Sequence, residues 1–291
     1  MGLRDLLRRV KRRVVYGGYA WHVHAYLRAL KSVKRPFGSG TGIHAVNLSF
    51  DTEIGFCMAF WRKEPESVVV GLGQKARATL TPFIGYLGTE RIPCSVQIVA
   101  ALLDRDLSTV DRFFDAGQRG LVARHRDLFR LTDDEVALLR SPLVEIGIHG
   151  LSHRPIATMG LEDARYEIVE AARLVEARFG KKPRWMSFPK NGVAHLEALA
   201  ENGIGWWRGC EAASGRAGEI PEGLFYSTAV LNPSELRRVL RTLKKRYPDG
   251  FLLQLWGHFT EMPLEELKAG VEAIRAEGWT FAAVPEDYVH A

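Results

Sequence analysis

The sequence predicts an α/β fold built on a parallel sheet. Short apolar runs typical of strands alternate with amphipathic helical patterns along about 250 residues. After residue 42, no second linker, internal repeat or low-complexity tract interrupts the alternation, which indicates one large domain over residues 43–291. A closed barrel and an open, doubly wound sheet both satisfy this pattern.

Each expected element follows from its local pattern. Strands are expected where short apolar runs end at polar or turn-forming residues. These runs are His44–Phe50, Pro93–Val99, Val144–Ile148, Arg184–Phe188, Phe251–Trp256 and Gly278–Val284. Helices are expected where apolar residues recur on one helical face. These segments are Gln74–Leu87, Leu161–Phe179, Ala194–Glu201, Pro233–Tyr247 and Pro263–Glu277.

The N-terminal segment is strongly basic. Residues 1–35 contain ten Lys or Arg and one acid, a net charge of +9, whereas the remaining 30 basic and 33 acidic residues give −3. Leu3, Leu7 and Val10 recur among the basic residues at helical spacing. We therefore expect residues 1–42 to form a basic amphipathic segment and linker, with residues 1–35 binding an anionic membrane surface. A helix docked on its own domain, or a frayed basic tail, explains the pattern equally well.

The remaining composition excludes several classes of protein. The mildly acidic body argues against a nucleic-acid partner. Three cysteines without a Cys-x-x-Cys pair argue against a disulfide framework and favour a reducing compartment. No run approaches the roughly 20 apolar residues that span a bilayer, and no signal peptide is expected. The sequence therefore predicts a cytoplasmic protein, peripheral at the inner membrane face if the basic segment binds lipid.

Polar residues follow four of the expected strands directly. They are Asp51 and Glu53, His149 and His153, the run Pro189, Lys190 and Asn191, and finally His258. Buried strands have no structural need for acids and imidazoles at their ends. Because the carboxyl ends of the strands of a parallel barrel meet at one mouth, these side chains are expected to gather there.

The segment His149-Gly-Leu-Ser-His153 predicts part of a metal site. Two imidazoles four residues apart can face one centre, and histidine is a preferred ligand of Zn²⁺. Glu53 or Asp51 supplies a third ligand, since positions i and i+2 of an extended segment point to one side. Open positions would then remain for water and substrate, as in a hydrolytic site. The second carboxylate would act as general base, and His258, across the mouth, as proton donor.

Four segments in this order resemble the polysaccharide deacetylases of the NodB-type homology domain, carbohydrate esterase family 4. They are Phe50-Asp-Thr-Glu53, His149-Gly-Leu-Ser-His153, Ser187-Phe-Pro-Lys-Asn191 and Leu255-Trp-Gly-His258. The resemblance spans about residues 44–285. It implies that Asp51 is the catalytic base and His258 the catalytic acid. It also implies that Glu53, His149 and His153 are the metal ligands.

The resemblance further implies a fold and a reaction. The fold is a distorted (β/α) barrel of about seven strands. The reaction is metal-dependent removal of an acetyl group, more often from nitrogen than from oxygen, from a sugar. Zinc is the expected ion, with cobalt, nickel and manganese as alternatives. A cytoplasmic site and a basic N-terminal segment favour a lipid-linked or nucleotide-linked sugar, made for a cell-surface polysaccharide.

The sequence departs from the family pattern at several positions. Thr52 stands where a second acid is usual, and Ser187 stands in place of the arginine that supports the base. Arg208, at the next strand end, is a candidate to supply that cation. Gln254 and Phe259 stand where many relatives have a histidine and a proline.

Further residues are candidates for substrate binding. A backbone N–H near Lys190 is a candidate oxyanion donor, and Asn191 lies beside it. Trp206, Trp207 and Trp256 could offer flat faces to sugar rings, although core packing explains any one of them.

Two other functions are compatible with parts of the sequence. Gly71-Leu-Gly73-Gln-Lys-Ala76 matches a dinucleotide-binding turn after a short apolar run, which would indicate an NAD(P)-dependent oxidoreductase. A glycine-punctuated entry to the helix at Gln74 explains it equally well. The departures in the catalytic motifs also allow a degenerate barrel that binds carbohydrate without turnover.

Overall fold

The computed structural model describes residues 38–209, 214–216, 226–229, 233–259 and 263–284. Residues 1–37, and with them nearly all of the expected basic segment, lie outside the described residues. Cys210 lies outside them as well. Within the part of the chain that is described, no helix is both long and apolar enough to cross a membrane.

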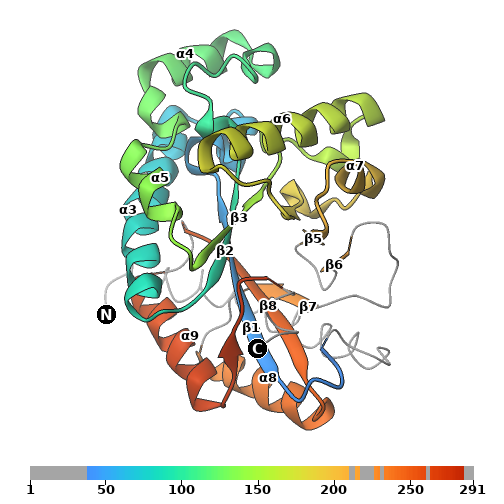
Figure 1. Ribbon diagram of the computed structural model, residues 1–291. Coiled ribbons are helices and arrows are strands. Elements are labelled where there is room, and N and C mark those ends of the chain that lie inside the picture. The colour runs from blue at the N-terminus through green and yellow to red at the C-terminus, as the bar shows by residue number, and fades with distance from the viewer. Residues whose placement is uncertain (1–37, 210–213, 217–225, 230–232, 260–262, 285–291) are drawn as a thin grey trace.

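The core of the fold is a curled sheet of parallel strands (Figure 1). The strands are β1 (His44–Thr52), β2 (Cys94–Ile98), β3 (Val144–Ile148), β4 (Trp185–Ser187), β5 (Trp206–Arg208), β6 (Ser214–Arg216), β7 (Tyr226–Ala229), β8 (Phe251–His258) and β9 (Thr280–Phe281). Their order is β6-β5-β4-β3-β2-β1-β8-β7, and β9 pairs with the start of β1. Only β6 is antiparallel to its described neighbour. The expected distorted (β/α) barrel is confirmed.

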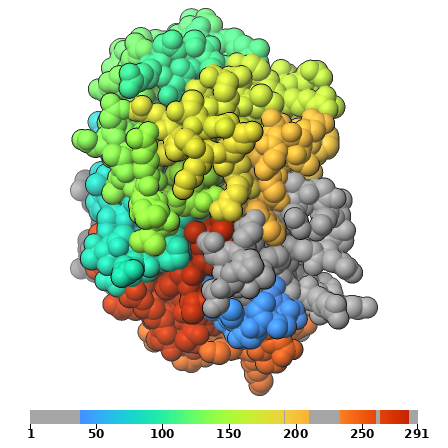
Figure 2. Space-filling model, viewed as in Figure 1, coloured from blue at the N-terminus to red at the C-terminus, as the bar shows by residue number. Residues whose placement is uncertain are grey.

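Helices cover the outside of the sheet. Those described are α2 (Met58–Trp61), α3 (Glu66–Thr89), α4 (Ala116–Arg124), α5 (Asp133–Leu139), α6 (Leu161–Phe179), α7 (Leu196–Glu201), α8 (Pro233–Arg246) and α9 (Leu264–Ala276). In Figure 2 the green and yellow surface of α4, α5 and α6 lies above the orange and red surface of α8 and α9. The amphipathic pattern predicted α6 with both ends correct, whereas α4 and α5 were not expected.

The helix α3 overturns the dinucleotide-binding interpretation. It begins at Glu66 rather than at Gln74, so Gly71, Gly73 and Ala76 all lie inside it. A dinucleotide-binding turn requires a strand, a tight turn and a helix N-terminus in that order. The apolar run before Gly71 is helical, which leaves no strand and no turn. The buried face of α3 explains the pattern, because Gly73 and Ala76 pack toward the core.

The two faces of β1 have different characters, and this difference positions the site. Val46, Leu48 and Phe50 belong to the large apolar core shared with the helices. The alternate residues Asn47, Ser49 and Asp51 are polar and buried on the other face, inside the barrel. The polar face of the first strand therefore leads along the interior to the barrel mouth.

Hydrogen bonds satisfy much of this polar interior. Asn47 Nδ2 donates to the carbonyl oxygens of Ala282 and Ala283, at 3.0 and 2.7 Å. Gln254 Nε2 donates to Asn47 Oδ1 at 2.8 Å. Gln254 is the register partner of Asn47, which precedes Asp51 by four residues on β1. Gln254 therefore lies deeper in the barrel than Asp51 does. Its departure from the family pattern is therefore a structural feature of the barrel interior, away from the mouth.

Part of the expected linker contacts the domain. The backbone N–H groups of Gly40 and Gly42 both donate to the carbonyl oxygen of Asp249, at 2.9 and 2.7 Å. The described end of this segment is thereby held against the loop that follows α8. The division of the chain at residue 42 stays a prediction.

Candidate metal centre

The first acidic pair lies where β1 ends. Asp51 is the penultimate residue of β1, and Glu53 follows the strand directly. Their carboxylates face the same imidazole, because His149 Nε2 lies 3.9 Å from Asp51 Oδ2 and 3.8 Å from Glu53 Oε1. The expectation that the two acids point to one side therefore agrees with the geometry.

The two histidines come from the tight loop that follows β3. Gly150 has φ +71° and His153 has φ +66°, so the chain twice enters the left-handed region and turns back on itself. A Cβ at Gly150 would lie 3.3 Å from Pro189 Cγ, which adds a steric reason for glycine at that position. The turn brings the two imidazoles together with their ring centroids 4.8 Å apart.

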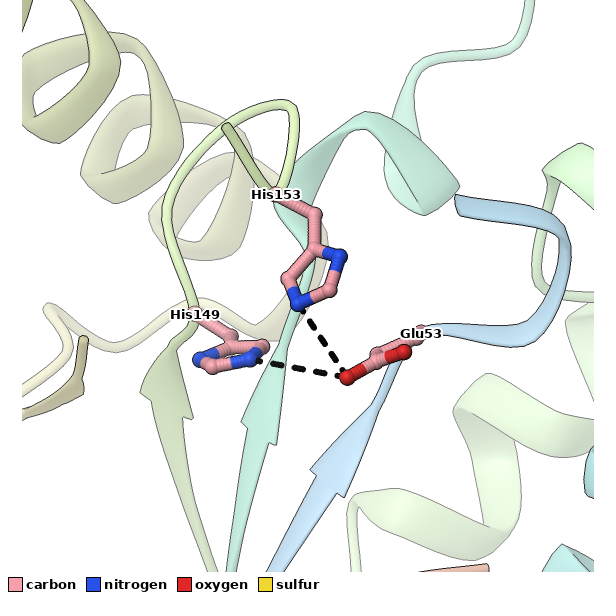
Figure 3. A group of neighbouring side chains, drawn as sticks. All are labelled: Glu53, His149 and His153. Carbon is pink, nitrogen blue, oxygen red and sulfur yellow. Dashed lines mark ion pairs between the residues drawn. The ribbon is translucent and has the colours of Figure 1, made fainter. Parts of the chain in front are cut away.

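Glu53, His149 and His153 converge on one small volume. His153 Nε2 lies 3.1 Å from Glu53 Oε1, and one ligand atom from each of the three residues lies within 4.8 Å of the others. Figure 3 shows both rings directed at the Glu53 carboxylate, above the ends of neighbouring strands. Both histidine side chains are 2% exposed and Glu53 is 13% exposed, so the group is largely screened from solvent.

Hydrogen bonds at Nδ1 leave Nε2 as the nitrogen of each imidazole that can face the Glu53 carboxylate. His149 Nδ1 lies 2.9 Å from the carbonyl oxygen of Ser187, and His153 Nδ1 lies 2.8 Å from that of Phe56. A carbonyl oxygen can only accept, so each Nδ1 carries the proton and donates it. Each Nε2 is then the ring nitrogen that faces Glu53, as in histidines that bind a metal through Nε2.

This donor set fits a divalent cation. Two nitrogen lone pairs and a carboxylate oxygen repel one another at these distances unless a cation or a proton lies between them. Burial raises the pKa of Glu53, but the neighbouring His153 and His258 outweigh it, and the net pKa lies well below the usual 4.5. The carboxylate is therefore anionic at neutral pH, and one carboxylate with two imidazoles is a set typical of catalytic zinc.

Asp51 has a separate set of partners on the barrel interior. Arg208 Nη2 and Ser187 Oγ both donate to Asp51 Oδ1, the latter at 2.8 Å. The second oxygen, Oδ2, has no hydrogen-bond partner among the described residues and is buried. One oxygen is thus held in place, while the other faces the imidazoles of His149 and His258.

Burial and charge act on Asp51 in opposite directions. Burial raises the pKa of Asp51, but the Arg208 guanidinium, with His149 and His258, lowers it more, and the net pKa lies below the usual 3.8. The side chains of Asp51 and Arg208 are 0% and 1% exposed, so solvent screens their attraction little. Asp51 is therefore a carboxylate, able to accept a proton, at any pH near neutrality.

His258 lies beside Asp51 rather than across the mouth. The strand β8 pairs directly with β1, and His258 is the register partner of Asp51. Its Nε2 lies 3.2 Å from Glu53 Oε1 and 3.9 Å from Asp51 Oδ2. The expected position is wrong because the last long strand returns to pair with the first. His258 nevertheless reaches the same cluster, and its side chain is 22% exposed.

The remaining candidate residues differ in their access to the mouth. Trp206 and Trp207 are buried, so neither offers a face to a sugar. Trp256 is only partly buried, and its ring lies edge-on to His258 with centroids 5.7 Å apart. Lys190 is exposed, in a left-handed conformation with φ +55°. Asn191 is the last residue of the short 3-10 turn Pro189–Asn191, which also contains Lys190.

The comparisons with known proteins agree with this geometry. Residues 109–202 match the family model described as polysaccharide deacetylase. The resemblance to the polysaccharide deacetylases is confirmed. A Mycobacterium smegmatis protein assigned as a polysaccharide deacetylase has a similar structure, with TM-score 0.56, 13% identity, and 89% of this chain and 94% of that chain covered.

Two further solved structures share the fold. BA3943 of Bacillus anthracis, described as a CE4 family pseudoenzyme, has TM-score 0.50 and 11% identity, with 85% of this chain and 66% of that chain covered. Puue allantoinase has TM-score 0.55 and 13% identity, with 86% and 90% covered. The comparison with curated proteins found no match.

The departures from the polysaccharide deacetylase pattern can be understood from the structure. Ser187, in place of the usual arginine, bonds to Asp51, and its Oγ also lies 2.6 Å from His149 Nδ1. Arg208 is the register partner of Ser187 on β5 and extends its guanidinium to the same carboxylate. Phe259 stacks on Phe50 in the core, with ring centroids 5.3 Å apart. A cationic side chain therefore still contacts Asp51 in this chain, but it comes from β5 and not from the position of Ser187 on β4.

Replacing Arg208 by methionine is expected to shift the acid limb of the pH–rate profile to higher pH. Without the guanidinium, burial dominates and raises the pKa of Asp51, so its carboxylate becomes protonated at a higher pH. In the wild type the lowered pKa of Asp51 stabilises the folded state at pH values above the unfolded pKa, near 3.8. This stabilisation is lost as the pH falls through the lower pKa that Asp51 has in the folded state.

The same variant is expected to lose about 3–5 kcal/mol of unfolding free energy at neutral pH, because a buried charge loses its partner. Urea unfolding measures this loss of unfolding free energy. The dependence of kcat/KM on pH measures the shift of the acid limb. Arg208→Lys keeps the positive charge and should lie closer to the wild type. If the acid limb of Arg208→Met lies at the same pH as that of the wild type, Arg208 does not lower the pKa of Asp51.

Proposed function

We propose that this protein is a metal-dependent hydrolase that removes an acetyl group, most often an N-acetyl group, from a sugar. The convergence of Glu53, His149 and His153 beside the separately held Asp51 carboxylate supports this function above all else. A structural metal site has no need of a second acid with an oxygen left without a hydrogen bond. The match of residues 109–202 to the deacetylase family model supports the same proposal.

In this proposal Glu53, His149 and His153 hold the cation, with zinc as the expected ion. When bound, the cation polarises the acyl carbonyl and lowers the pKa of the attacking water. The hydrogen bonds at Nδ1 orient both rings before the cation arrives. The site is therefore largely organised in advance, as tight binding in a fixed geometry requires.

Two residues would move protons. Asp51 Oδ2, ionised and without a hydrogen bond among the described residues, takes a proton from the attacking water as general base. His258, on the neighbouring strand and partly open to solvent, gives a proton to the departing amine. Because both side chains face the cluster from adjacent strands, the proton acceptor and the proton donor stand at one mouth.

Three other residues would bind the substrate. The backbone N–H near Lys190 would stabilise the developing oxyanion. Trp256, beside His258, would contact the sugar ring. Asn191, in the same loop as Lys190, is the third candidate. These roles rest on placement in the chain beside the mouth and on the resemblance.

The proposed substrate is a sugar carried on a lipid or a nucleotide, and the proposed place of action is a membrane surface. The basic segment at residues 1–35 supports attachment to an anionic membrane surface. A cytoplasmic site beside such a membrane suits a lipid-linked or nucleotide-linked sugar destined for a surface polysaccharide. No nucleic-acid partner is proposed.

The direct test is acetate release by the full-length protein loaded with Zn²⁺. The panel contains undecaprenyl-linked and nucleotide-linked N-acetyl sugars, with O-acetyl sugars as a comparison. We expect release of acetate and appearance of a free amine from at least one N-acetyl sugar, lost with a chelator and restored by Zn²⁺. Stoichiometric zinc with sugar binding but no acetate from any member would support the alternative, a degenerate carbohydrate-binding barrel.

A further inference from the structure

Glu167 is a fully buried carboxylate that the proposed reaction does not use. It lies on α6, on the helix face formed by Ala164, Ile168 and Ala171, where apolar residues are expected. Its side chain is 0% exposed. Burying a carboxylate among apolar groups is costly unless hydrogen bonds compensate, so its partners indicate its role.

The partners of Glu167 are all in the loop that carries the histidines. Oε2 accepts hydrogen bonds from the backbone N–H groups of Leu151 and Ser152, each at 3.0 Å. Oε1 accepts a hydrogen bond of 2.5 Å from Ser152 Oγ, and Arg154 Nη1 lies 3.9 Å away. One side chain thus contacts three donors of the segment between His149 and His153.

The carbonyl oxygens of Gly150 and Leu151 accept hydrogen bonds from the backbone N–H groups of Ala100 and Ala101, at 3.0 and 2.9 Å, whereas the N–H groups of the turn depend on Glu167. Gly150 and His153 both have positive φ, a conformation that costs energy for a residue with a side chain. A Cβ at Gly150 would lie 3.5 Å from Glu167 Oε2, so the carboxylate packs closely under the turn. The two backbone N–H groups point inward, toward α6, and would have no acceptor without Glu167.

We propose that Glu167 is a positioning residue for the metal centre, which fastens the loop so that both Nε2 atoms face Glu53. This inference rests on the proposed function, since it takes His149 and His153 as metal ligands. Glu167 touches neither the cluster nor the substrate, and acts only through the loop. Partners of this kind orient the ligands of a metal, and their loss typically weakens metal affinity about 10–100-fold.

The experiment compares three variants of the full-length chain. Glu167→Leu fills a similar buried volume but leaves both N–H groups without an acceptor. Glu167→Gln keeps one oxygen for those groups and a donor for the Ser152 hydroxyl. Ser152→Ala removes only the hydroxyl donor. Glu170→Gln is the matched control, because Glu170 lies on the same helix and pairs with Arg173 at the surface.

Two measurements separate positioning from stability alone. Zn²⁺ affinity comes from chelator competition, with the absorption spectrum of the Co²⁺ form reporting ligand geometry. Amide hydrogen exchange of the peptide containing residues 149–153 is measured on metal-free protein. We expect Glu167→Leu to bind Zn²⁺ about 10–100-fold more weakly, with an altered Co²⁺ spectrum and faster exchange. Glu167→Gln and Ser152→Ala should show smaller changes of the same kind, and Glu170→Gln none.

The outcomes distinguish this inference from the proposed function. Wild-type affinity and spectrum in Glu167→Leu would overturn the positioning role and leave the proposed function intact. Should Glu167→Leu not fold, wild-type affinity and exchange in both Glu167→Gln and Ser152→Ala would overturn it equally. A wild-type protein that binds no metal would instead overturn the proposed function itself.

Discussion

Replacing Asp51 by asparagine is expected to lower kcat for acetate release about 10²–10⁴-fold, the usual contribution of a general base. Asparagine has nearly the same shape as aspartate but does not accept a proton from water at neutral pH. The three proposed metal ligands are untouched, so the variant should still bind one metal ion per chain. Initial rates, with zinc content measured on the same samples, test this expectation.

A second effect of this substitution must be separated from the loss of the base. An asparagine in place of Asp51 would leave the buried Arg208 guanidinium without its anionic partner, which destabilises the fold. Arg208→Met breaks the same pair but keeps the carboxylate at any pH above its shifted acid limb, so at such a pH it serves as the matched control. If Asp51→Asn releases acetate as fast as the wild type, Asp51 is not the base.

The double variant His149→Ala/His153→Ala is expected to lose stoichiometric metal and, with it, acetate release. Only one carboxylate of the proposed ligand set remains, and a single oxygen donor holds Zn²⁺ weakly. A ligand that binds only the folded state at 1,000 times its Kd stabilises that state by about 4.1 kcal/mol. Added Zn²⁺ should therefore raise the Tm of the wild type and leave that of the double variant unchanged.

The control for this experiment is His195→Ala. His195 lies outside the cluster, and its Nε2 bonds to the carbonyl oxygen of Met159 at 3.1 Å. Metal content measured by atomic emission should be normal in this variant and absent from the double variant. Equal metal content in the double variant would place the metal elsewhere in the protein.

Local sequence patterns predicted much of the regular structure. The apolar periodicity of residues 161–179 predicted α6 from end to end, because a 3.6-residue repeat sustained over many turns is characteristic of a helix with one buried face. The same reasoning placed the start of α3 too late. Gly71 and Gly73 resemble a turn in sequence, but both lie inside a helix whose buried face includes Gly73. The short strands β6 and β7 were not expected, because three or four residues carry almost no period.

The candidate site was predicted by residue type and by position at strand ends. Parallel strands bring their carboxyl ends together whatever their order, so Asp51, Glu53, His149 and His153 could be grouped without knowing the sheet. The position of His258 could not be predicted in this way, because it depends on which strand pairs with β1. Strand order arises from contacts between residues far apart in the chain, which local periodicity does not record.

The sequence by itself determined the alternation of strands and helices and the chemical set at the barrel mouth. Only the tertiary structure decided which partner each buried charge has. Arg208 on β5 donates a hydrogen bond to Asp51 on β1, 157 positions earlier in the chain. Glu167 on α6 accepts a hydrogen bond from Ser152 in the loop that follows β3. A buried charge is stable only where folding supplies a counter-charge or hydrogen bonds, and that supply is a property of three-dimensional packing.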